Sequence, residues 1–422
     1  MNIKVRLIIL NFLEFAIWGA YLTCMSRYLI TAGLGDYISY FYSVQGFVSL
    51  FMPALMGIVA DRWIQAQKTL SLCQLIAGVA MCAAAFYGNS AGANANFATL
   101  FGLYTLSVAF YMPTIALTNS VAYAALDGAG LDTVKSFPPI RVWGTVGFII
   151  AMLCVDWGGL QDKPWQFAVS GTLSIIMAFY ALTMPACKID KTKKATSLVD
   201  ALGLRAFTLF KQKKMAIFFI FSMLLGSALQ ITNGYANPFI ASFGAEEAFV
   251  NTFGVQHANT LISLSQMSET LCILLIPFFL KRFGIKTVML MSMFAWVFRF
   301  GFFAMGDPGF PGVILLVLSM IVYGIAFDFF NISGSLFVDQ ETDLNIRSSA
   351  QGLFMMMTNG LGASIGMLLA GQVVNHFTHG ELVNGEFYTL GDWTTCWWIF
   401  SCYALVVAVL FAILFRYKHN PK

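Results

Sequence analysis

The sequence predicts an all-α membrane protein, and the evidence lies in its composition, its apolar runs and the charges of its loops. Charged residues make up 10% of the 422 positions, apolar residues make up 59%, and the mean hydropathy is +0.75. A soluble globular domain carries about 25% charged residues. The apolar runs are about 20 residues long, which is the length that a helix needs to cross a bilayer. They lack the strict polar–apolar alternation of barrel strands, so helices are expected.

Twelve apolar runs have the length of a membrane span. The start, "MNIKVRLIILNFLEF", has no cleavage site and is expected to open the first span rather than to form a signal peptide. The expected spans are 5–30, 38–60, 67–88, 96–121, 138–159, 165–186, 215–240, 258–280, 285–305, 311–338, 346–370 and 393–415. The longest polar connection follows the sixth span and holds eight Lys or Arg residues. It predicts an N-terminal six-helix bundle (1–186), a cytoplasmic basic linker (187–214) and a C-terminal six-helix bundle (215–422).

Loop charge predicts the orientation. With the N-terminus inside, the cytoplasmic loops and tails hold about twenty of the 24 Lys and Arg residues, as the positive-inside rule requires. The outside loops hold essentially Lys163 alone. Both termini are therefore expected in the cytoplasm. Because topology explains the basic residues, no nucleic-acid partner is expected.

The fifth span carries a polar stripe. Arg141, Thr145 and Phe148 follow at i, i+4 and i+7, which places them on one helix face. Pro138 and Pro139 precede them and predict a helix start, where a missing amide donor is tolerated. The alternative for Arg141 is a side chain that snorkels to the cytoplasmic surface.

Spans seven and eight each carry a pair of polar residues three positions apart. Gln230 and Asn233 share one face of span seven, and Gln266 and Glu269 share one face of span eight. Amides donate and accept hydrogen bonds, which suits a ligand with hydroxyl and amide groups, although they also join helices. A glutamate near the middle of a span indicates function, with a structural ion pair as the alternative. The Asn237–Pro238 step predicts that the helix ends or kinks there.

An aspartate interrupts the tenth apolar run, in "VYGIAFDFFNISGSLF". Tyr323, Phe327 and Asp328 project within an arc of about 140° on a helix. Aromatic rings can stack on a planar ligand, and a carboxylate can accept hydrogen bonds or carry a proton. A salt bridge between helices is the alternative for Asp328. Phe329 and Phe330 are expected to pack outward.

The first span also holds an acidic residue, Glu14, on the same face as Asn11 and Trp18. Glu14 can titrate, bond to another helix or ligate a cation, and the sequence leaves these roles open. A further set is interpreted as an interfacial aromatic belt: Trp296, Trp393, Trp397 and Trp398. His376 and His379 form an HxxH pattern in an outside loop without a third ligand, so neither a metal site nor a cofactor is expected.

Several blocks together resemble the nucleoside:proton symporters of the major facilitator superfamily. They include "FMPALMGIVAD", "SFPPIRVWGTVGFI", "SQMSETL" and "SMIVYGIAFDFFNISGSLFV", and the resemblance covers nearly the whole chain. "GIVADRW" (57–63) resembles the superfamily's signature between spans two and three, without its trailing Gly-Arg part. Two six-span halves with a substrate between them at mid-membrane are the plan of that superfamily.

The resemblance implies a twelve-helix fold and proton-driven uptake of nucleosides across the bacterial inner membrane. Purine and pyrimidine nucleosides such as adenosine and uridine, protons and the lipid bilayer are the implied partners, and a monomer is expected. The implied nucleoside-binding residues are Arg141, Thr145, Phe148, Gln230, Asn233, Gln266, Glu269, Tyr323, Phe327 and Asp328. Asp328 is the first candidate for proton coupling, with Glu269 second and Glu14 as a further candidate.

Three other functions remain open from the residues alone, one of which is a receptor that binds nucleosides without transporting them. Aromatic, amide and carboxylate side chains serve sugars as well as nucleosides, so a sugar or oligosaccharide:cation symporter of the same fold is one alternative. A multi-pass membrane enzyme is another, although the sequence has neither an HExxH motif nor a CxxC pair.

Overall fold

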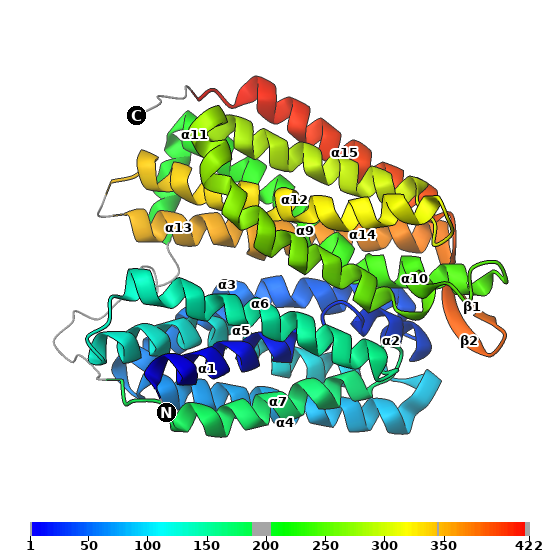
Figure 1. Cartoon of the computed structure of the whole chain (residues 1–422), viewed down its shortest axis with the longest axis horizontal. Coiled ribbons are helices and arrows are strands. Elements are labelled where there is room, and N and C mark those ends of the chain that lie inside the picture. Colours follow the sequence, from blue (N-terminus) through cyan, green and yellow to red (C-terminus); the bar gives the residue numbers. More distant parts are fainter. Residues whose placement is uncertain (1, 188–203, 344–345, 418–422) are drawn as a thin grey trace. The chain divides into compact units, whose positions relative to one another are not determined.

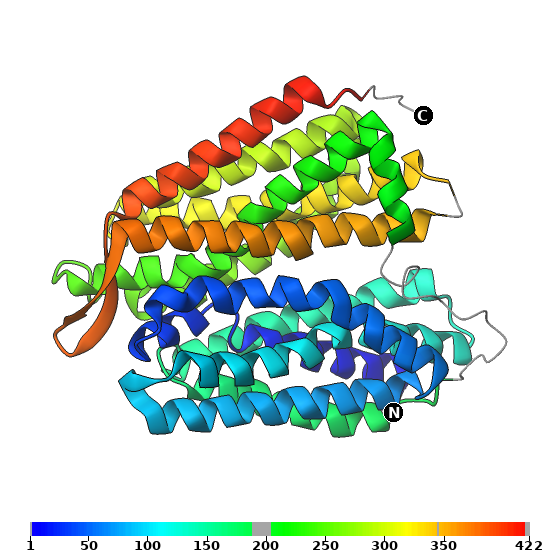
Figure 2. The ribbon, with the colours of Figure 1, turned by 180° about the vertical axis from the view of Figure 1, so that it is seen from behind.

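The computed structural model describes residues 2–187, 204–343 and 346–417 and divides into two compact units. The first unit comprises Met1–Leu34 and Phe47–Leu202, and the second comprises Gly35–Gly46 and Gly203–Lys422. Within each unit the long helices run side by side (Figures 1 and 2). Helix α3 (Ile38–Arg62) contributes its first residues to the second unit and the remainder to the first. The predicted domain boundaries stay a prediction.

The other helices of the first unit are α1 (Ile3–Gly19), α2 (Met25–Thr31), α4 (Ala66–Ala91), α5 (Phe97–Gly128), α6 (Thr133–Trp157) and α7 (Trp165–Leu182). Short 3₁₀ turns are formed by η1 (Gly35–Tyr37), which belongs to the second unit, and by η2 (Gly92–Asn94). Helices α1 and α6 pack closely. A Cβ atom on Gly147 would collide with the carbonyl of Phe12, and one on Gly19 would collide with the carbonyl of Phe148. A core of small buried side chains continues this contact: Ala16, Ala20, Cys24, Ala151 and Val155.

The first predicted span is not one continuous helix. Helix α1 ends at Gly19, residues 20–24 form turns, and α2 begins at Met25. Gly19 lowers the helix propensity at the break, but no proline or charge marks it in the sequence. The prediction of a single helix over 5–30 is therefore wrong.

The second unit contains η3 (Leu204–Lys211), α9 (Lys213–Ser242), η4 (Phe243–Ala245), α10 (Phe253–Gln256), α11 (Ala258–Met305), α12 (Gly312–Glu341), α13 (Arg347–Met355), the π-helical segment η5 (Met356–Gly362), α14 (Ala363–Phe377) and α15 (Trp393–Leu414). Helix α11 has 48 residues and bends at Gly284, whose φ of 76° and ψ of 168° are not helical. It therefore comprises two helical stretches, and both contact α12: Ser268 on the first donates to the Ile321 carbonyl, and Ser292 on the second donates to the Ala326 carbonyl.

Ten helices of the described residues are long and apolar enough to cross a membrane. The kinked α11 counts once among them, and α1, with 17 residues, is not included. The described part of the chain is thus a helical membrane protein, apart from one short β-hairpin. The structure does not describe the side chains of Asp61 and Arg62 in the "GIVADRW" motif. Residues 188–203 of the predicted linker also lie outside the described residues.

Prolines do not set the helix ends that the sequence suggests. Helix α6 begins at Thr133, so Pro138 and Pro139 lie inside it rather than at its start. Helix α9 continues through Pro238 to Ser242, so it does not end at the Asn237–Pro238 step. A helix in lipid tolerates internal prolines because neighbouring groups can satisfy the freed carbonyls.

The predicted outside loop 371–392 contains a β-hairpin of β1 (Thr378–Val383) and β2 (Glu386–Gly391), visible at one end of the second unit in Figure 2. The strands are antiparallel and pair Thr378 with Gly391. Asn384 and Gly385 form the turn with φ values of 52° and 87°. An Asn-Gly step with both residues at positive φ is the preferred two-residue hairpin turn.

Two expectations about aromatic residues are wrong. Trp296, Trp393 and Trp397 are buried in the second unit, where the Trp397 ring stacks on Phe303 at 4.6 Å, and only Trp398 of the four is exposed. Phe329 and Phe330 are also buried rather than outward-facing. The interior between neighbouring helices is as apolar as lipid. The sequence pattern therefore does not distinguish an aromatic residue that packs between helices from one that faces the bilayer.

Candidate functional site

Asp328 lies in the second unit, on α12, where this helix touches the first stretch of α11. Gly324, one turn before Asp328, permits the contact, because a Cβ atom there would lie 2.6 Å from the carbonyl oxygen of Ser268. The hydroxyl of Ser268 also donates to the carbonyl of Ile321 on α12. Glu269 follows Ser268 directly. The close approach therefore places the two acidic residues at neighbouring levels of two packed helices.

The two carboxyl groups interact electrostatically, and Glu269 is the charged neighbour of Asp328. Asp328 is 5% exposed, and its Oδ2 atom has no hydrogen-bond partner within the described residues. Two like charges at membrane depth destabilise one another, and burial adds to the cost of each. This pair can lower its energy by binding a proton or by accepting a donor from a ligand.

Aromatic rings border the acidic pair. The rings of Tyr323 and Phe327 stack with centroids 5.7 Å apart and an interplanar angle of 12°. The ring of Trp296 meets Tyr323 edge-on at 6.0 Å. Tyr323 also interacts with the side chains of Gln266, Glu269 and Asp328. The structure thus brings together four of the residues selected from sequence, and Phe327 adjoins them.

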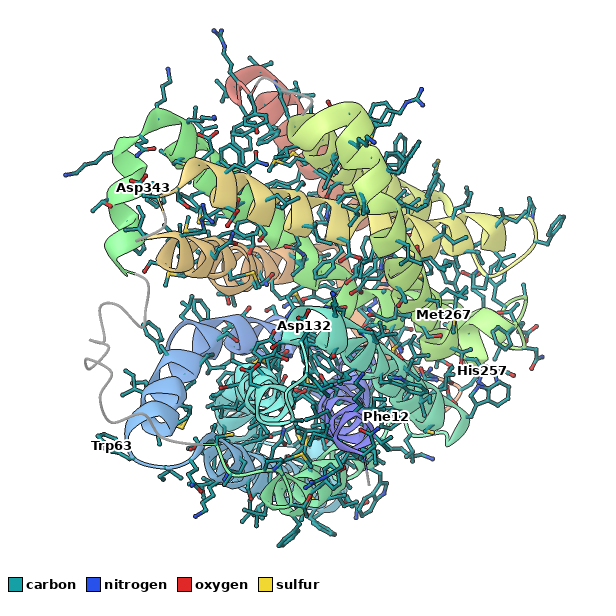
Figure 3. All side chains as sticks on the ribbon, turned by 60° about the vertical axis from the view of Figure 1, so that its left-hand side comes forward. Phe12, Trp63, Asp132, His257, Met267 and Asp343 are labelled. Carbon is teal, nitrogen blue, oxygen red and sulfur yellow. The ribbon has the colours of Figure 1, made fainter. Side chains whose placement is uncertain are left out.

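The side chains of the predicted polar stripe on span eight are partly exposed. Gln266 and Glu269 are half-buried, whereas Ser265 and Ser268 on the same helix are buried. Met267, labelled on α11 in Figure 3, is exposed. Gln266 and Glu269 therefore lie on neither the most buried nor the most exposed face of α11.

The amide pair on α9 is joined by its own hydrogen bond. The side-chain nitrogen of Asn233 donates to Oε1 of Gln230 at 2.8 Å. This bond confirms that the two side chains share a face, as the spacing of three predicts. It also orients them, because the Gln230 carbonyl oxygen must face the Asn233 amide to accept this bond.

The first unit holds the predicted stripe of span five. The guanidinium carbon of Arg141 lies 3.8 Å from the centroid of the Phe15 ring. Phe148 is buried and meets Trp18 edge-on, with centroids 6.3 Å apart. Arg141 and Thr145 are half-buried. The cation–π contact holds the guanidinium of Arg141 against the Phe15 ring.

Glu14 is the centre of a buried polar cluster in the same unit. Its Oε1 accepts from Thr114 at 2.6 Å, and its Oε2 accepts from Gln74 at 2.9 Å and from Thr118 at 3.0 Å. Its backbone carbonyl accepts from the Tyr111 hydroxyl at 2.6 Å. The carboxyl group is fully buried and electrostatically linked to Arg141. The structure therefore relates Glu14 to the span-five stripe.

Sequence reasoning missed several members of these groups. Gln74, Thr114 and Thr118 contact Glu14 from α4 and α5, and no spacing rule connects them to α1. Arg299 was also missed, although an arginine inside the apolar run "AWVFRFGFF" carries the same signal as Asp328. It is almost fully buried in the second unit, beside Tyr323.

His376 and His379, the HxxH pattern, lie at the end of α14 and in β1. The ring of His379 contacts Glu381 at 3.3 Å, and both side chains are exposed. This arrangement is that of a solvated hairpin.

Comparison with known proteins identifies the family. The model of the nucleoside H⁺ symporter family matches residues 1–420. The xanthosine permease of Escherichia coli (strain K12) is 48% identical over 425 residues, covering 100% of this chain and 98% of that protein. The nucleoside permease NupG of the same organism is 47% identical over 421 residues, covering 99% and 97%.

Solved structures agree with this family assignment. The crystal structure of the nucleoside transporter NupG has a TM-score of 0.90 at 46% identity, covering 99% of this chain and 100% of that one. The xylose transporter XylE from E. coli, in a partially occluded inward-open conformation, shares the fold alone, with a TM-score of 0.59 at 12% identity over 98% and 99% of the two chains. The relatives are permeases, so this chain is a transporter and not an enzyme. It belongs to the nucleoside H⁺ symporter family and acts by proton symport.

Proposed function

We propose that this chain imports nucleosides across the bacterial inner membrane and that Asp328 couples their entry to that of protons. The observation that carries the proposal is the carboxyl group of Asp328, which is buried beside Glu269 with one oxygen lacking a hydrogen-bond partner among the described residues. Protonation of this pair removes one of two neighbouring negative charges. Glu269 is the second candidate for the coupling role, and Glu14 is the third.

The nucleoside has a flat base and a hydroxyl-rich sugar, and the selected side chains suit both parts. Phe148, Tyr323 and Phe327 stack on the base or wall it, because aromatic rings favour planar partners. The amides of Gln230, Asn233 and Gln266 bond to the edges of the base or ribose. The other polar groups of the nucleoside are bound by Arg141, Thr145, Glu269 and Asp328. Adenosine and uridine, a purine and a pyrimidine nucleoside, are the proposed substrates.

The proton supplies the driving force. One charge that moves inward along the membrane potential yields about 2.3 kcal/mol per 100 mV, which can concentrate a neutral solute more than tenfold. The binding residues must face the two sides of the membrane alternately, as in other transporters with repeated halves. A binding group that holds its proton only together with the nucleoside prevents a proton leak.

The chain crosses the membrane twelve times, with both termini in the cytoplasm, and functions as a monomer. Ten helices of the described residues have the length and apolarity of a membrane span, which supports ten of the twelve crossings. The kink at Gly284 divides the long α11 into two crossings, and α1 with α2 provides the remaining one. The basic loops support the orientation.

Uptake into proteoliposomes tests the function. An outside-acidic pH gradient should drive labelled uridine and adenosine above equilibrium, whereas an inward sodium gradient at equal pH should not. Unlabelled nucleosides should compete with the label, and free sugars should not. Accumulation driven by sodium alone, or competition by sugars but not by nucleosides, would contradict the proposal.

A further inference from the structure

Arg299 is a buried cation that joins three helical stretches of the second unit. It lies on the second stretch of α11 and is 2% exposed. Its Nη1 donates to the backbone carbonyl of Ser319 on α12 at 2.7 Å and to the hydroxyl of Ser265 on the first stretch of α11 at 3.3 Å. The Ser319 hydroxyl donates back to the Arg299 carbonyl at 2.9 Å. The guanidinium therefore braces α12 against both stretches of α11.

The burial of Arg299 is not balanced by an anion. No carboxylate of the described residues forms an ion pair with it, and its Nε has no hydrogen-bond partner there. Burying a cation without an anion costs free energy that an apolar side chain of similar length would not cost. Packing alone therefore does not explain an arginine at this position.

Aromatic rings supply the negative potential that Arg299 lacks from carboxylates. Its guanidinium carbon lies 4.4 Å from the centroid of the Tyr323 ring and 5.5 Å from that of Phe303. A cation over an aromatic face is attracted by the ring quadrupole, most strongly where water is excluded. Tyr323 is thus held by Arg299 as well as by its contacts with Phe327 and Trp296.

Arg299 is linked to the acidic pair through Tyr323 and through Ser265. Asp328 is nine residues beyond Ser319 on α12, or about 13 Å along the axis at 1.5 Å per residue. Tyr323 lies between these levels and interacts with Arg299, Glu269 and Asp328. Ser265, the other partner of the guanidinium, lies one turn before Glu269 on α11.

We propose that Arg299 is a positioning residue for nucleoside binding. Its guanidinium fixes the helix that carries Gln266 and Glu269 against the helix that carries Tyr323 and Asp328, and it holds the Tyr323 side chain beside the acidic pair, where it borders the nucleoside. This inference rests on the proposed function, because it assigns Arg299 to the same nucleoside site.

The test compares nucleoside affinity in purified, folded variants. Arg299→Met keeps the length and apolar stem but loses the charge, and Arg299→Lys keeps a cation above the ring. Equilibrium binding of labelled uridine and adenosine should weaken roughly tenfold in Arg299→Met. This factor corresponds to the loss of a desolvated cation–π contact together with its hydrogen bonds. Arg299→Lys should recover most of that loss. Equal losses in both variants would overturn a role for the charge.

A double-mutant cycle tests the route through Tyr323. Tyr323→Ala removes the ring and should weaken binding by itself. If Arg299 acts through the ring, adding Arg299→Met to Tyr323→Ala should weaken binding by much less than tenfold. Full additivity of the two effects would overturn the part of the proposal in which Arg299 positions the Tyr323 ring.

Lys286 provides the matched control. It is a cation on the same stretch of α11, and its Nζ donates to the Ala412 carbonyl at 2.9 Å, away from Tyr323. Lys286→Met should leave nucleoside affinity unchanged.

If Arg299→Met does not reach the membrane, Ser265→Ala is the variant that tests the proposal. It removes one acceptor of the guanidinium and should weaken binding about threefold, as expected for loss of one hydrogen bond; unchanged affinity overturns the inference.

The unaltered protein separates the two proposals. If it binds no nucleoside, the proposed function fails and the role of Arg299 fails with it. If it binds nucleosides and Arg299→Met binds them equally well, only the role of Arg299 fails.

Discussion

Asp328 is nearly fully buried, and asparagine matches its shape while removing its ability to bind and release a proton. We therefore predict that Asp328→Asn still binds nucleosides, within about tenfold of the original affinity, since an amide retains an acceptor and gains a donor. Uphill uptake driven by a pH gradient should be abolished. Binding and uptake measured on the same preparation check this, and nucleoside accumulation against a gradient by Asp328→Asn would refute the coupling role.

Asp339 is the control carboxylate for this experiment. It lies on the same helix and pairs with Arg347 at 3.1 Å, with nearly half of its side chain exposed. An exposed ion pair contributes about 0–1 kcal/mol. Asp339→Asn should therefore retain both nucleoside binding and uphill uptake.

Glu14 is a residue whose removal should destabilise the first unit. Glu14→Ala removes the buried acceptor of Thr114, Thr118 and Gln74, although Thr114 can still donate to the Tyr111 carbonyl and Gln74 to the Thr114 hydroxyl. We expect a loss of about 3 kcal/mol, because buried groups without partners cost about 1–3 kcal/mol each and hydroxyls can partly reorient. Glu14→Gln should lose less, because it keeps one acceptor. The thermal unfolding midpoints in detergent measure this, and an alanine variant as stable as the original would contradict it.

At the scale of helices, Gly324 controls how closely α12 approaches α11. Gly324→Ala places a Cβ atom 2.6 Å from the Ser268 carbonyl and 2.7 Å from Cys272 Sγ. Since the backbone carbonyl cannot move alone, the helices must separate, at a cost of about 1–3 kcal/mol. Nucleoside affinity should fall as Glu269 and Asp328 move apart.

Gly352→Ala is the matched control for Gly324→Ala. Gly352 lies in α13, and an added Cβ atom there meets no atom within 4 Å. This change should stabilise the protein by up to about 1 kcal/mol through helix propensity. If both alanine variants have the same unfolding midpoint and affinity, the close approach at Gly324 is unimportant.

The start of α15 predicts a pH dependence. Asp392 is its N-cap, accepting from the Thr395 amide at 2.9 Å and from the Thr395 hydroxyl at 2.6 Å. These hydrogen bonds hold the pKa of Asp392 below its ordinary value of 3.8. A lowered folded-state pKa stabilises the protein above the unfolded-state pKa, and this contribution disappears as pH falls through the folded-state value.

Asp392→Ala should therefore lower the unfolding midpoint near neutral pH. The difference from the original protein should shrink as the pH falls below 3.8. Asp392→Asn caps the helix without ionising, so its midpoint should remain close to the original near neutral pH. A difference between alanine and aspartate that is the same at both ends of the pH range would contradict this account.

For the whole molecule, the class and most span positions were predictable because lipid imposes simple rules of length and apolarity. The stripes at Gln230 and Asn233 and at Tyr323 and Phe327 were predictable for the same reason, since helical spacing fixes which side chains are neighbours. The break after Gly19 and the internal Pro138 and Pro139 were not, because packing against other helices decides them.

Contacts between distant segments were the least predictable. The partners of Glu14 come from α4 and α5, and spacing along α1 carries no information about them. Trp296 and Trp397 were assigned to the interface because a tryptophan near a span end suits either environment. By contrast, the hairpin turn at Asn384 and Gly385 had a recognisable Asn-Gly signal, and Arg299 had the signal of any charge inside a span.

The proposed topology gives the last prediction. Gly380 lies in β1 with open space around it, and Lys211 lies at the end of η3, just before α9. With both termini inside, Gly380 faces the exterior and Lys211 the cytoplasm. In a Cys187→Ser background, a membrane-impermeant thiol reagent should label Gly380→Cys in intact cells, and Lys211→Cys only after permeabilisation. The other cysteines lie within helices or turns of the spans, and the Cys187→Ser protein without an added cysteine measures the labelling that they contribute. Labelling of Lys211→Cys in intact cells would invert the orientation, and labelling of both sites from one side would exclude an odd number of crossings between them.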